Sequence, residues 1–507
     1  MEKNRLQIVE KVKLWFGPGG KEGYRWASNH KGLLVGLCRQ PLCEICNLAE
    51  REKLRGFRGG ELEVRLVPYR RPTFWKEEIF YLAHLIRVSE REAVKTIGAD
   101  EGIEFDISRL NTLLLSTVKG SILIDPGEMG FDSDEAGFQK LISGRKIIAA
   151  IITHGHLDHW NHLNALPSGT VFMSKLTFQL ASRHASWQND SRLVIALRRA
   201  QKISPGEPLL LNENLPIKID TFSLPHSIPE TMGLIIKGRK KRIVHLGDFK
   251  LSGMEVEARD ETISRFSQIA EEPVDFLSLN IVNAHLEGFT PIEAKAVEAI
   301  TDIMAEAKGR VIITSFSTNL ERIRRLTEVA KMLGREVHFF GAGMKNAKEF
   351  LEFKQEKGAD PGKSVVFITG CQAEEDSVLW RIAYGEDLKL TFSFYPTDTL
   401  IFSSRCVPGN ESDLREQIIT LRPKVEKLVV NEGEIEQIGL QDIEVEEAPV
   451  HVSGHGNKED LRLVLEIFRP KKVLPWPQIS PQIEAFREIT EPLGIEVLPE
   501  TERVIET

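Results

Sequence analysis

The spacing of apolar positions changes along the chain, and the change predicts two kinds of domain. Between about residues 110 and 275, short apolar runs bounded by turn residues predict β-strands, most clearly at 113–115, 122–124 and 147–152. From about residue 275 onward, helical and strand spacing alternate. Thr290-Pro291-Ile292-Glu293 has the pattern of a capping box that opens a helix, and Val311–Thr314 has that of a strand. Such alternation is typical of a parallel sheet covered by helices.

The first hundred residues differ from both of these parts. Apolar positions spaced as on one face of a helix predict a helix at 79–86. A capping box at Ser89 and Glu92 predicts a second helix, which Gly98 ends. We therefore expect a separate N-terminal module.

Three of the five cysteines lie close together in this module. Cys38, Cys43 and Cys46 have the spacing of the first three ligands of a plant-type iron–sulfur cluster, but the next cysteine is Cys371. With His30 they could instead form a tetrahedral zinc site. Reduced thiols that pack beside neighbouring leucines are an equally good interpretation.

Composition narrows the class of protein. The 507 residues are 41% hydrophobic and 28% charged, which is typical of a globular protein of two or three domains. Lys and Arg number 66 against 74 Asp and Glu, and this balance argues against a chain covered in nucleic acid but permits a local basic groove. No run resembles a signal peptide or membrane span, and five cysteines are too few for a disulfide scaffold. A cytoplasmic, soluble protein is expected.

The strongest chemical signal is the run Thr153-His154-Gly155-His156-Leu157-Asp158-His159, which directly follows a predicted strand. On a loop at the end of a strand, the two alternate histidines can point into one cavity, while the aspartate and the last histidine serve a neighbouring position. Imidazole and carboxylate are ligands that a borderline cation such as Zn²⁺ prefers. A surface cluster of histidines without function is the alternative.

This run resembles the signature of the metallo-β-lactamase superfamily, and other landmarks follow in the same order. Asp125 ends an apolar strand, and His226 and Asp248 stand in His-Ser-Ile-Pro and His-Leu-Gly-Asp-Phe runs. The resemblance implies two sets of metal ligands: His154, His156 and His226 for one ion, Asp158 and His159 for a second, and Asp248 as a bridge.

Motifs in the second half resemble one branch of that superfamily, the β-CASP nucleases, and ribonuclease J most of all. They are Ser315-Phe316-Ser317-Thr318-Asn319 with Arg322, Thr369-Gly370-Cys371-Gln372, Ile401-Phe402-Ser403-Ser404 and Val452-Ser453-Gly454-His455. The resemblance implies an α/β fold in which a β-CASP cap is inserted into an αββα metallo-β-lactamase sandwich. The expected parts are an N-terminal module at 1–105, the first part of the sandwich at 106–275, the β-CASP domain at 276–430, and the second part of the sandwich at 431–507.

The resemblance also implies roles for single residues. His455 would bind the scissile phosphate or act as general acid, and Asp158 would hold or deprotonate a water that zinc activates. The residues expected to contact substrate are Ser317, Asn319, Gly370, Gln372, Ser403 and Ser404. One or two zinc ions per chain are the expected cofactors, with manganese as an alternative. The expected partner is RNA, with single-stranded DNA as an alternative.

Two positions depart from the ribonuclease J pattern. That family has a further metal-binding histidine in a Pro-x-His-Gly-Glu run, where this chain has Pro477 at the histidine position and no later histidine in that run. An acid that orients a histidine in the cap motif is replaced by Asn280, which carries no charge. The site could use a single ion, or His162 could be a substitute ligand rather than a plain helix-surface histidine. A third interpretation is that the protein has lost catalysis and binds nucleic acid only.

Weaker signals leave further alternatives open. The basic run 237–242 is expected to be a hairpin turn, either solvated or in contact with phosphates. Cys371 and Cys406 lie in cap motifs, and we expect them to be packing residues rather than nucleophiles. A small-molecule hydrolase on the same core is disfavoured, because such an enzyme does not need a β-CASP insertion. A metal-dependent ribonuclease is therefore the leading hypothesis.

Overall fold

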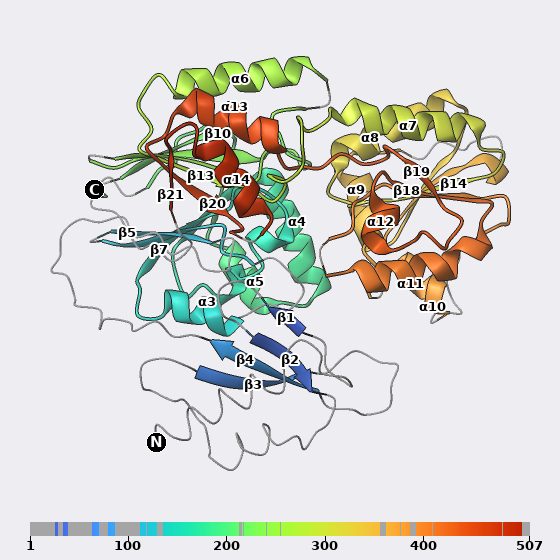
Figure 1. Cartoon of the computed structure of the whole chain (residues 1–507), viewed down its shortest axis with the longest axis horizontal. Coiled ribbons are helices and arrows are strands. Elements are labelled where there is room, and N and C mark those ends of the chain that lie inside the picture. The colour runs from blue at the N-terminus through green and yellow to red at the C-terminus, as the bar shows by residue number, and fades with distance from the viewer. Residues whose placement is uncertain are drawn as a thin grey trace, which may run out of the picture. The chain divides into compact units, whose positions relative to one another are not determined.

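The computed structural model describes residues 112–498 apart from short gaps, and the backbone of four strands nearer the N-terminus (Figure 1). These four strands form an antiparallel sheet in the order β1-β2-β4-β3. Their bounds are β1 (Trp26–Ser28), β2 (Leu34–Cys38), β3 (Glu63–Tyr69) and β4 (Phe80–Ile86).

The helix predicted at 79–86 is wrong, because β4 pairs with both β2 and β3. Its apolar positions fit helical spacing, but a short run that is almost wholly apolar and aromatic also suits a strand between two others. The second predicted helix, at 89–98, lies outside the described residues. So do His30, Cys43 and Cys46, and nothing about the side chain of Cys38 is described, so the zinc site remains a prediction.

Residues 100–507 form a second compact unit. Its first sheet has five strands in the order β5-β6-β7-β8-β9, parallel from β6 onward. The strands are β5 (Leu113–Thr117), β6 (Gly120–Ile124), β7 (Ile147–Ile151), β8 (Thr170–Ser174) and β9 (Ala200–Ile203). Helices α3 (Glu135–Ile142), α4 (Lys175–Trp187) and α5 (Ser191–Leu197) belong to the same part of the chain. Apolar residues of these helices pack on one face of the sheet.

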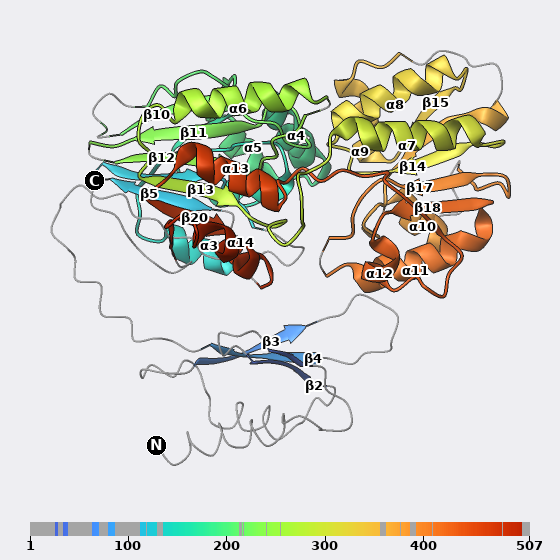
Figure 2. The same ribbon diagram turned by 45° about the horizontal axis from the view of Figure 1, so that its top comes forward.

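The second sheet has six strands in the order β10-β11-β12-β13-β20-β21. The strands are β10 (Lys218–Ser223), β11 (Met232–Lys237), β12 (Arg242–Gly247), β13 (Phe276–Asn280), β20 (Lys472–Trp476) and β21 (Glu496–Val497). Its outer face is covered by α6 (Glu257–Ile269), α13 (Lys458–Phe468) and α14 (Gln482–Thr490). Residues such as Ile124 and Ile151 of the first sheet pack against Ile236 and Leu474 of the second. The order of layers is therefore helix, sheet, sheet, helix, as Figures 1 and 2 show.

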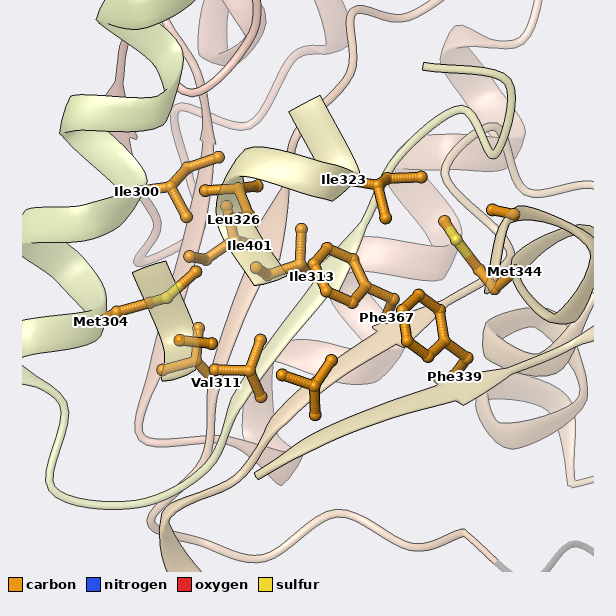
Figure 3. Close-up of a cluster of buried hydrophobic side chains, with 14 of the residues drawn as sticks. Ile300, Met304, Val311, Ile313, Ile323, Leu326, Phe339, Met344, Phe367 and Ile401 are labelled. Atoms are coloured by element: carbon orange, nitrogen blue, oxygen red, sulfur yellow. The ribbon is translucent and has the colours of Figure 1, made fainter. Parts of the chain in front are cut away.

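The inserted cap is a parallel sheet in the order β15-β16-β14-β17-β18-β19. Its strands are β14 (Val311–Thr314), β15 (Val337–Phe340), β16 (Val365–Ile368), β17 (Thr399–Phe402), β18 (Lys427–Asn431) and β19 (Glu446–Ala448). One face packs on α7 (Glu293–Glu306), α8 (Leu320–Met332) and α9 (Ala342–Phe350), as Figure 3 shows in close-up. The other packs on α10 (Val378–Tyr384), α11 (Glu411–Leu421) and α12 (Glu434–Ile438).

The predicted cap limits of 276 and 430 differ from the strand pairing at both ends. β13 lies in the sandwich between β12 and β20, whereas β18 and β19 lie in the cap sheet. The chain therefore leaves the sandwich after Asn280 and returns after Ala448. As expected, the cap is inserted and not woven into the sandwich. Among the described helices, none is both long and apolar enough to cross a bilayer.

Candidate metal centre

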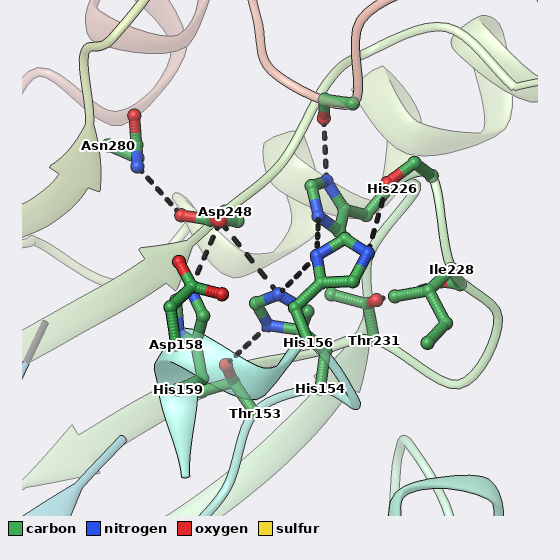
Figure 4. Close-up of polar contacts among 12 residues, drawn as sticks. Thr153, His154, His156, Asp158, His159, His226, Ile228, Thr231, Asp248 and Asn280 are labelled. Carbon is green, nitrogen blue, oxygen red and sulfur yellow. Dashed lines mark hydrogen bonds and ion pairs between the residues drawn. The ribbon is translucent and has the colours of Figure 1, made fainter. Parts of the chain in front are cut away.

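The candidate ligands lie on loops that follow strands of both sandwich sheets, and their side chains converge (Figure 4). The loop after β7 runs into the short 3₁₀ helix η1 (Leu157–His159). His226 follows β10, and Asp248 directly follows β12. Two sheets packed face to face thus bring three separate loops to one place.

Three imidazoles and one carboxylate have the spacing of a tetrahedral metal site. His156 Nδ1 lies 3.1 Å from both His154 Nε2 and His226 Nε2, and His154 Nε2 lies 3.8 Å from Asp248 Oδ2. All four ligand atoms lie within 4.8 Å of one another. Donors held at about 2.0–2.1 Å by a tetrahedral ion are about 3.3 Å apart, so these residues fit a divalent ion with little movement.

Hydrogen bonds on the far side of two rings fix which nitrogen faces the centre. His226 Nδ1 lies 2.7 Å from the carbonyl oxygen of Gly454, which can only accept, so Nδ1 carries the proton and Nε2 is free. Thr153 Oγ1 donates to Asp125 Oδ2 at 2.6 Å and must therefore accept from His154 Nδ1 at 3.0 Å. Both histidines thus present a lone pair to the metal position.

His159 and Asp158, the residues expected at a second position, lie beside this group. His159 Nε2 is 3.1 Å from Asp248 Oδ2 and 3.7 Å from Asp158 Oδ2. Its Nδ1 is 3.0 Å from Asp125 Oδ2. Asp125 also accepts a hydrogen bond from the Thr153 backbone at 2.7 Å, so its oxygens are used in the interior. Asp125 therefore orients Thr153 and His159 rather than facing the open side, where Asp158 lies with 38% of its side chain exposed.

The two metal positions differ in the pKa values of their histidines. Burial lowers the pKa of His154 and His226 well below the usual range and that of His156 to about 4, so these rings are neutral at pH 7 and ready to bind a metal ion. Burial also opposes a charge on His159, but three neighbouring carboxylates outweigh it and hold that pKa well above the usual range. An ion bound by His159 must displace a proton, whereas one bound by the other three need not.

His455 lies beside the cluster on a loop from the second part of the sandwich. Its Nε2 is 3.8 Å from Asp248 Oδ2, and its ring centre is 5.3 Å from that of His226. Asn283 Nδ2 donates to Ser453 Oγ at 2.9 Å, and Thr290 Oγ1 donates to the His455 carbonyl at 2.9 Å. The segment that leads into the cap therefore holds the loop that carries His455.

The structure shows the surroundings of Asn280, which departs from the family pattern, and of His162, which was considered as a substitute ligand. Asn280 lies at the end of β13 in the sandwich and donates from Nδ2 to Asp248 Oδ1 at 2.8 Å, so it contacts a carboxylate and not a histidine. His162 is not a substitute ligand, and it is not a surface residue either. It is buried, its Nε2 lies 3.3 Å from Glu128 Oε2, and its ring stacks on Phe138 at 4.7 Å. Its ring is therefore used in packing and pairing outside the metal group.

Most of the expected substrate-contacting side chains are interior. Ser403 Oγ donates to the Val450 carbonyl at 2.7 Å, and Ser404 Oγ donates to the Cys371 carbonyl at 3.3 Å. Gln372 donates from Nε2 to the Arg405 carbonyl and accepts at Oε1 from the Val407 backbone nitrogen. The side chains of these three residues support the cap loops, and their contact with substrate stays a prediction. Asn319 and Gly370 are buried too, and only Ser317 of the six is partly exposed.

The junction between sandwich and cap contains buried charges that the sequence did not reveal. Glu293, at the first position of α7, accepts hydrogen bonds from Lys250 at 3.1 Å and from Arg322 at 2.8 Å. Arg322 also donates to the carbonyls of Ser403 and Val452. The capping box predicted at 290–293 is wrong, because the Glu293 side chain serves this cluster and α7 begins at Glu293 itself. Five segments that are distant in sequence thus meet at the base of the cap.

The basic hairpin lies away from Asp248, and the two cap cysteines are buried. The hairpin joins β11 to β12 at the end of β12 opposite to Asp248, and Lys237 and Arg242 pair with Glu272. Burial raises the pKa of the Cys371 thiol well above its usual value and that of Cys406 to about 12. Both are free and buried, which confirms their expected role in packing.

Comparison with known proteins agrees with this architecture. A family described as a beta-lactamase superfamily domain matches residues 121–308, and one described as the beta-CASP domain of ribonuclease J matches residues 308–421. A protein named Ribonuclease J from Sinorhizobium meliloti is 34% identical over 374 residues, which are 70% of this chain and 62% of that protein. One from Thermus thermophilus is 29% identical over 358 residues, 65% of this chain and 58% of that protein.

The matches confirm the fold but do not span whole relatives. The chain covers less than two thirds of the length of these two proteins. A crystal structure of a protein of unknown function from Enterococcus faecalis aligns over 80% of this chain and 100% of that one, with a TM-score of 0.52 at 16% identity, which supports the fold alone. The chain therefore has a metallo-β-lactamase fold with a β-CASP domain, and it is similar to proteins named Ribonuclease J.

Proposed function

We propose that this protein is a metal-dependent phosphodiester hydrolase that cleaves RNA in the manner of ribonuclease J. The observation that carries the proposal is the convergence of three neutral imidazoles and Asp248 within 4.8 Å, beside His455 and at the base of a β-CASP cap. Relatives named Ribonuclease J support RNA as the substrate. The sparse cysteines support a cytoplasmic setting.

Zinc is the proposed ion at the first position, because neutral imidazole nitrogens with one carboxylate suit a borderline cation. The ligands there would be His154, His156, His226 and Asp248. A second ion, zinc or manganese, would bind more weakly between Asp158 and His159, since Pro477 stands where the family has a histidine and His159 must first lose a proton. When bound, a divalent ion at this centre activates water and neutralises charge on a phosphate oxygen.

Two residues of the chain would move protons. Asp158 is proposed to orient the attacking water and accept its proton, because its carboxylate is partly exposed next to His159. His455 is proposed to protonate the leaving oxygen or hold the phosphate. Its side chain is 27% exposed, and its loop is fixed by Asn283 and Thr290. Ser317, partly exposed on the loop after β14, is the proposed contact to the RNA backbone.

The test is digestion of end-labelled RNA and of single-stranded DNA of the same sequence, with Zn²⁺ or Mn²⁺ and with EDTA. We expect cleavage of the RNA that EDTA abolishes and that added metal restores. His226→Gln should be inactive, whereas His338→Gln, at a partly exposed histidine of the cap, should cleave normally. A metal-loaded protein that cleaves neither nucleic acid would overturn the proposal, and preferential cleavage of DNA would overturn RNA as the substrate.

A further inference from the structure

Asn280 occupies one oxygen of the Asp248 carboxylate. Its Nδ2 lies 2.8 Å from Asp248 Oδ1, and its own Oδ1 lies 2.8 Å from the backbone nitrogen of Val282. A backbone N–H can only donate, so the amide oxygen must face Val282 and the amide NH₂ must face Asp248. The orientation of the amide is therefore fixed by its second contact.

The other oxygen of Asp248 faces the histidines. Asp248 Oδ2 is 3.1 Å from His159 Nε2 and 3.8 Å from both His154 Nε2 and His455 Nε2. Only 4% of Asp248 is exposed, so water cannot easily satisfy Oδ1 in place of the amide. Asn280, itself buried, provides the donor that Oδ1 needs.

A carboxylate at position 280 would act in the opposite way. An aspartate has the shape of asparagine and could still accept from Val282, but its second oxygen would lie against Asp248 Oδ1. Two buried carboxylates at that distance repel each other unless a cation lies between or beside them. An amide removes the need for that cation.

We propose that Asn280 is a positioning residue that makes this centre a one-ion site: it holds Asp248 with Oδ1 occupied and Oδ2 alone turned toward the imidazoles. Asn280 thereby satisfies Oδ1 without a cation, whereas a carboxylate at position 280 would favour a second ion beside Asp248. This inference rests on the proposed function only in assuming that the centre binds a divalent ion. It also accounts for Asn280 and Pro477 occurring in the same chain. Asn280 lacks the negative charge, and Pro477 lacks the ligand atom, that would favour binding of a second ion.

The experiment measures metal content and zinc affinity in buffered free Zn²⁺, without RNA. The wild type should hold one tight ion. Asn280→Asp should bind a second ion at least tenfold more tightly than the wild type does. Asn280→Ala should keep one ion but bind it about 10–100-fold more weakly, as for loss of other residues that support metal ligands. Substitution with Co²⁺ should show a changed absorption spectrum in Asn280→Asp, which a purely structural role would not produce.

Asn431→Asp is the matched control. Asn431 is also buried at the end of a strand, its Oδ1 accepts from the His451 backbone at 2.8 Å, and it lies in the cap sheet. This variant should bind zinc as the wild type does. Wild-type zinc content and affinity in Asn280→Asp, or two tight ions in the wild type, would overturn the inference. Absence of RNA cleavage together with the expected metal pattern would instead overturn the proposed function and leave the inference standing.

Discussion

The imidazole of His226 donates from Nδ1 to the carbonyl oxygen of Gly454 at 2.7 Å, and this bond joins a metal-ligand loop to the loop that carries His455. The approach is close because Gly454 has no side chain. A Cβ atom there would lie 2.6 Å from His226 Cε1 and 2.8 Å from Nδ1. The glycine thus permits the contact that leaves Nε2 of His226 free for metal.

Gly454→Ala should therefore weaken metal binding. The added methyl must displace the ring of His226, and loss of an orienting contact to a metal ligand typically costs about 10–100-fold in affinity. Zinc titration by calorimetry measures this effect. Gly494→Ala controls for a general loss of stability, because an alanine at its φ of 65° strains the backbone but its Cβ meets no atom within 4 Å. Equal affinity in the two variants would show that the bond to Gly454 does not orient His226.

His455→Ala should separate catalysis from metal binding. His455 is not among the four ligand atoms that lie within 4.8 Å of one another, so metal content should stay at the wild-type level. A general acid typically contributes about 10²–10⁴-fold in rate, and single-turnover cleavage of RNA should slow by that amount. Asp158→Asn should slow cleavage too, but should also reduce uptake of a second ion. Loss of the first ion in His455→Ala would contradict the assigned role.

Glu293→Gln should destabilise the protein strongly. The change leaves Lys250 and Arg322 buried without a counter-charge, and breaking a buried ion pair in this way costs about 3–5 kcal/mol. Burial opposes the charge on Glu293, yet these two cations lower its pKa to about 2, which shows how strongly they favour the carboxylate. The measurement is the free energy of unfolding in urea at fixed metal concentration and pH 7.

Glu321→Gln provides the comparison for that prediction. Glu321 lies on the surface of α8, where it pairs with Arg324 and Arg325, and exposed pairs contribute only about 0–1 kcal/mol. If the two variants lost the same free energy, the cluster at the base of the cap would be no more important than a surface pair.

The spacing of residues in the sequence was enough to predict the loops that carry the candidate ligands. It did not predict the hydrogen bonds that hold these loops in place. His154, His156 and Asp158 follow one strand within a few residues, so their proximity could be inferred from the sequence. The bonds from Asn280 to Asp248 and from Arg322 to Glu293 join different elements, and no periodicity marks them. They form because strand order places separate elements side by side.

The features of the structure that the sequence did not predict have a related cause. The apolar run in β4 fits the spacing of a helix as well as that of a strand, and only its pairing with two neighbours decides between them. Ser403 and Ser404 stand in a motif of the cap, yet burial turns their hydroxyls toward backbone carbonyls. A motif thus identifies a loop of the cap, but the burial of its side chains follows from packing that the motif does not show.

The metal-free protein should lose stability as the pH falls from about 6.5 to about 4, and His245 should cause part of this loss. His245 lies on β12 and is 1% exposed, with its ring stacked on Trp476 at 5.4 Å. Burial lowers its pKa from 6.5 to about 4. Between these values the unfolded chain takes up a proton at this residue and the folded chain does not, so the free energy of unfolding falls with falling pH. The shift corresponds to about 3 kcal/mol.

Urea unfolding in EDTA at pH 7, 6 and 5 tests this for His245→Asn against the wild type. His154, His156 and His226 contribute with the same sign, so the free energy of unfolding of the wild type should change steeply with pH. The variant should show a smaller slope, by the equivalent of about one proton taken up on unfolding. His159, whose pKa is raised, offsets them only near pH 7, because its contribution is fully present once the pH is below about 6.5. A slope unchanged in His245→Asn would mean that His245 is protonated in the folded protein, and that burial does not keep it neutral.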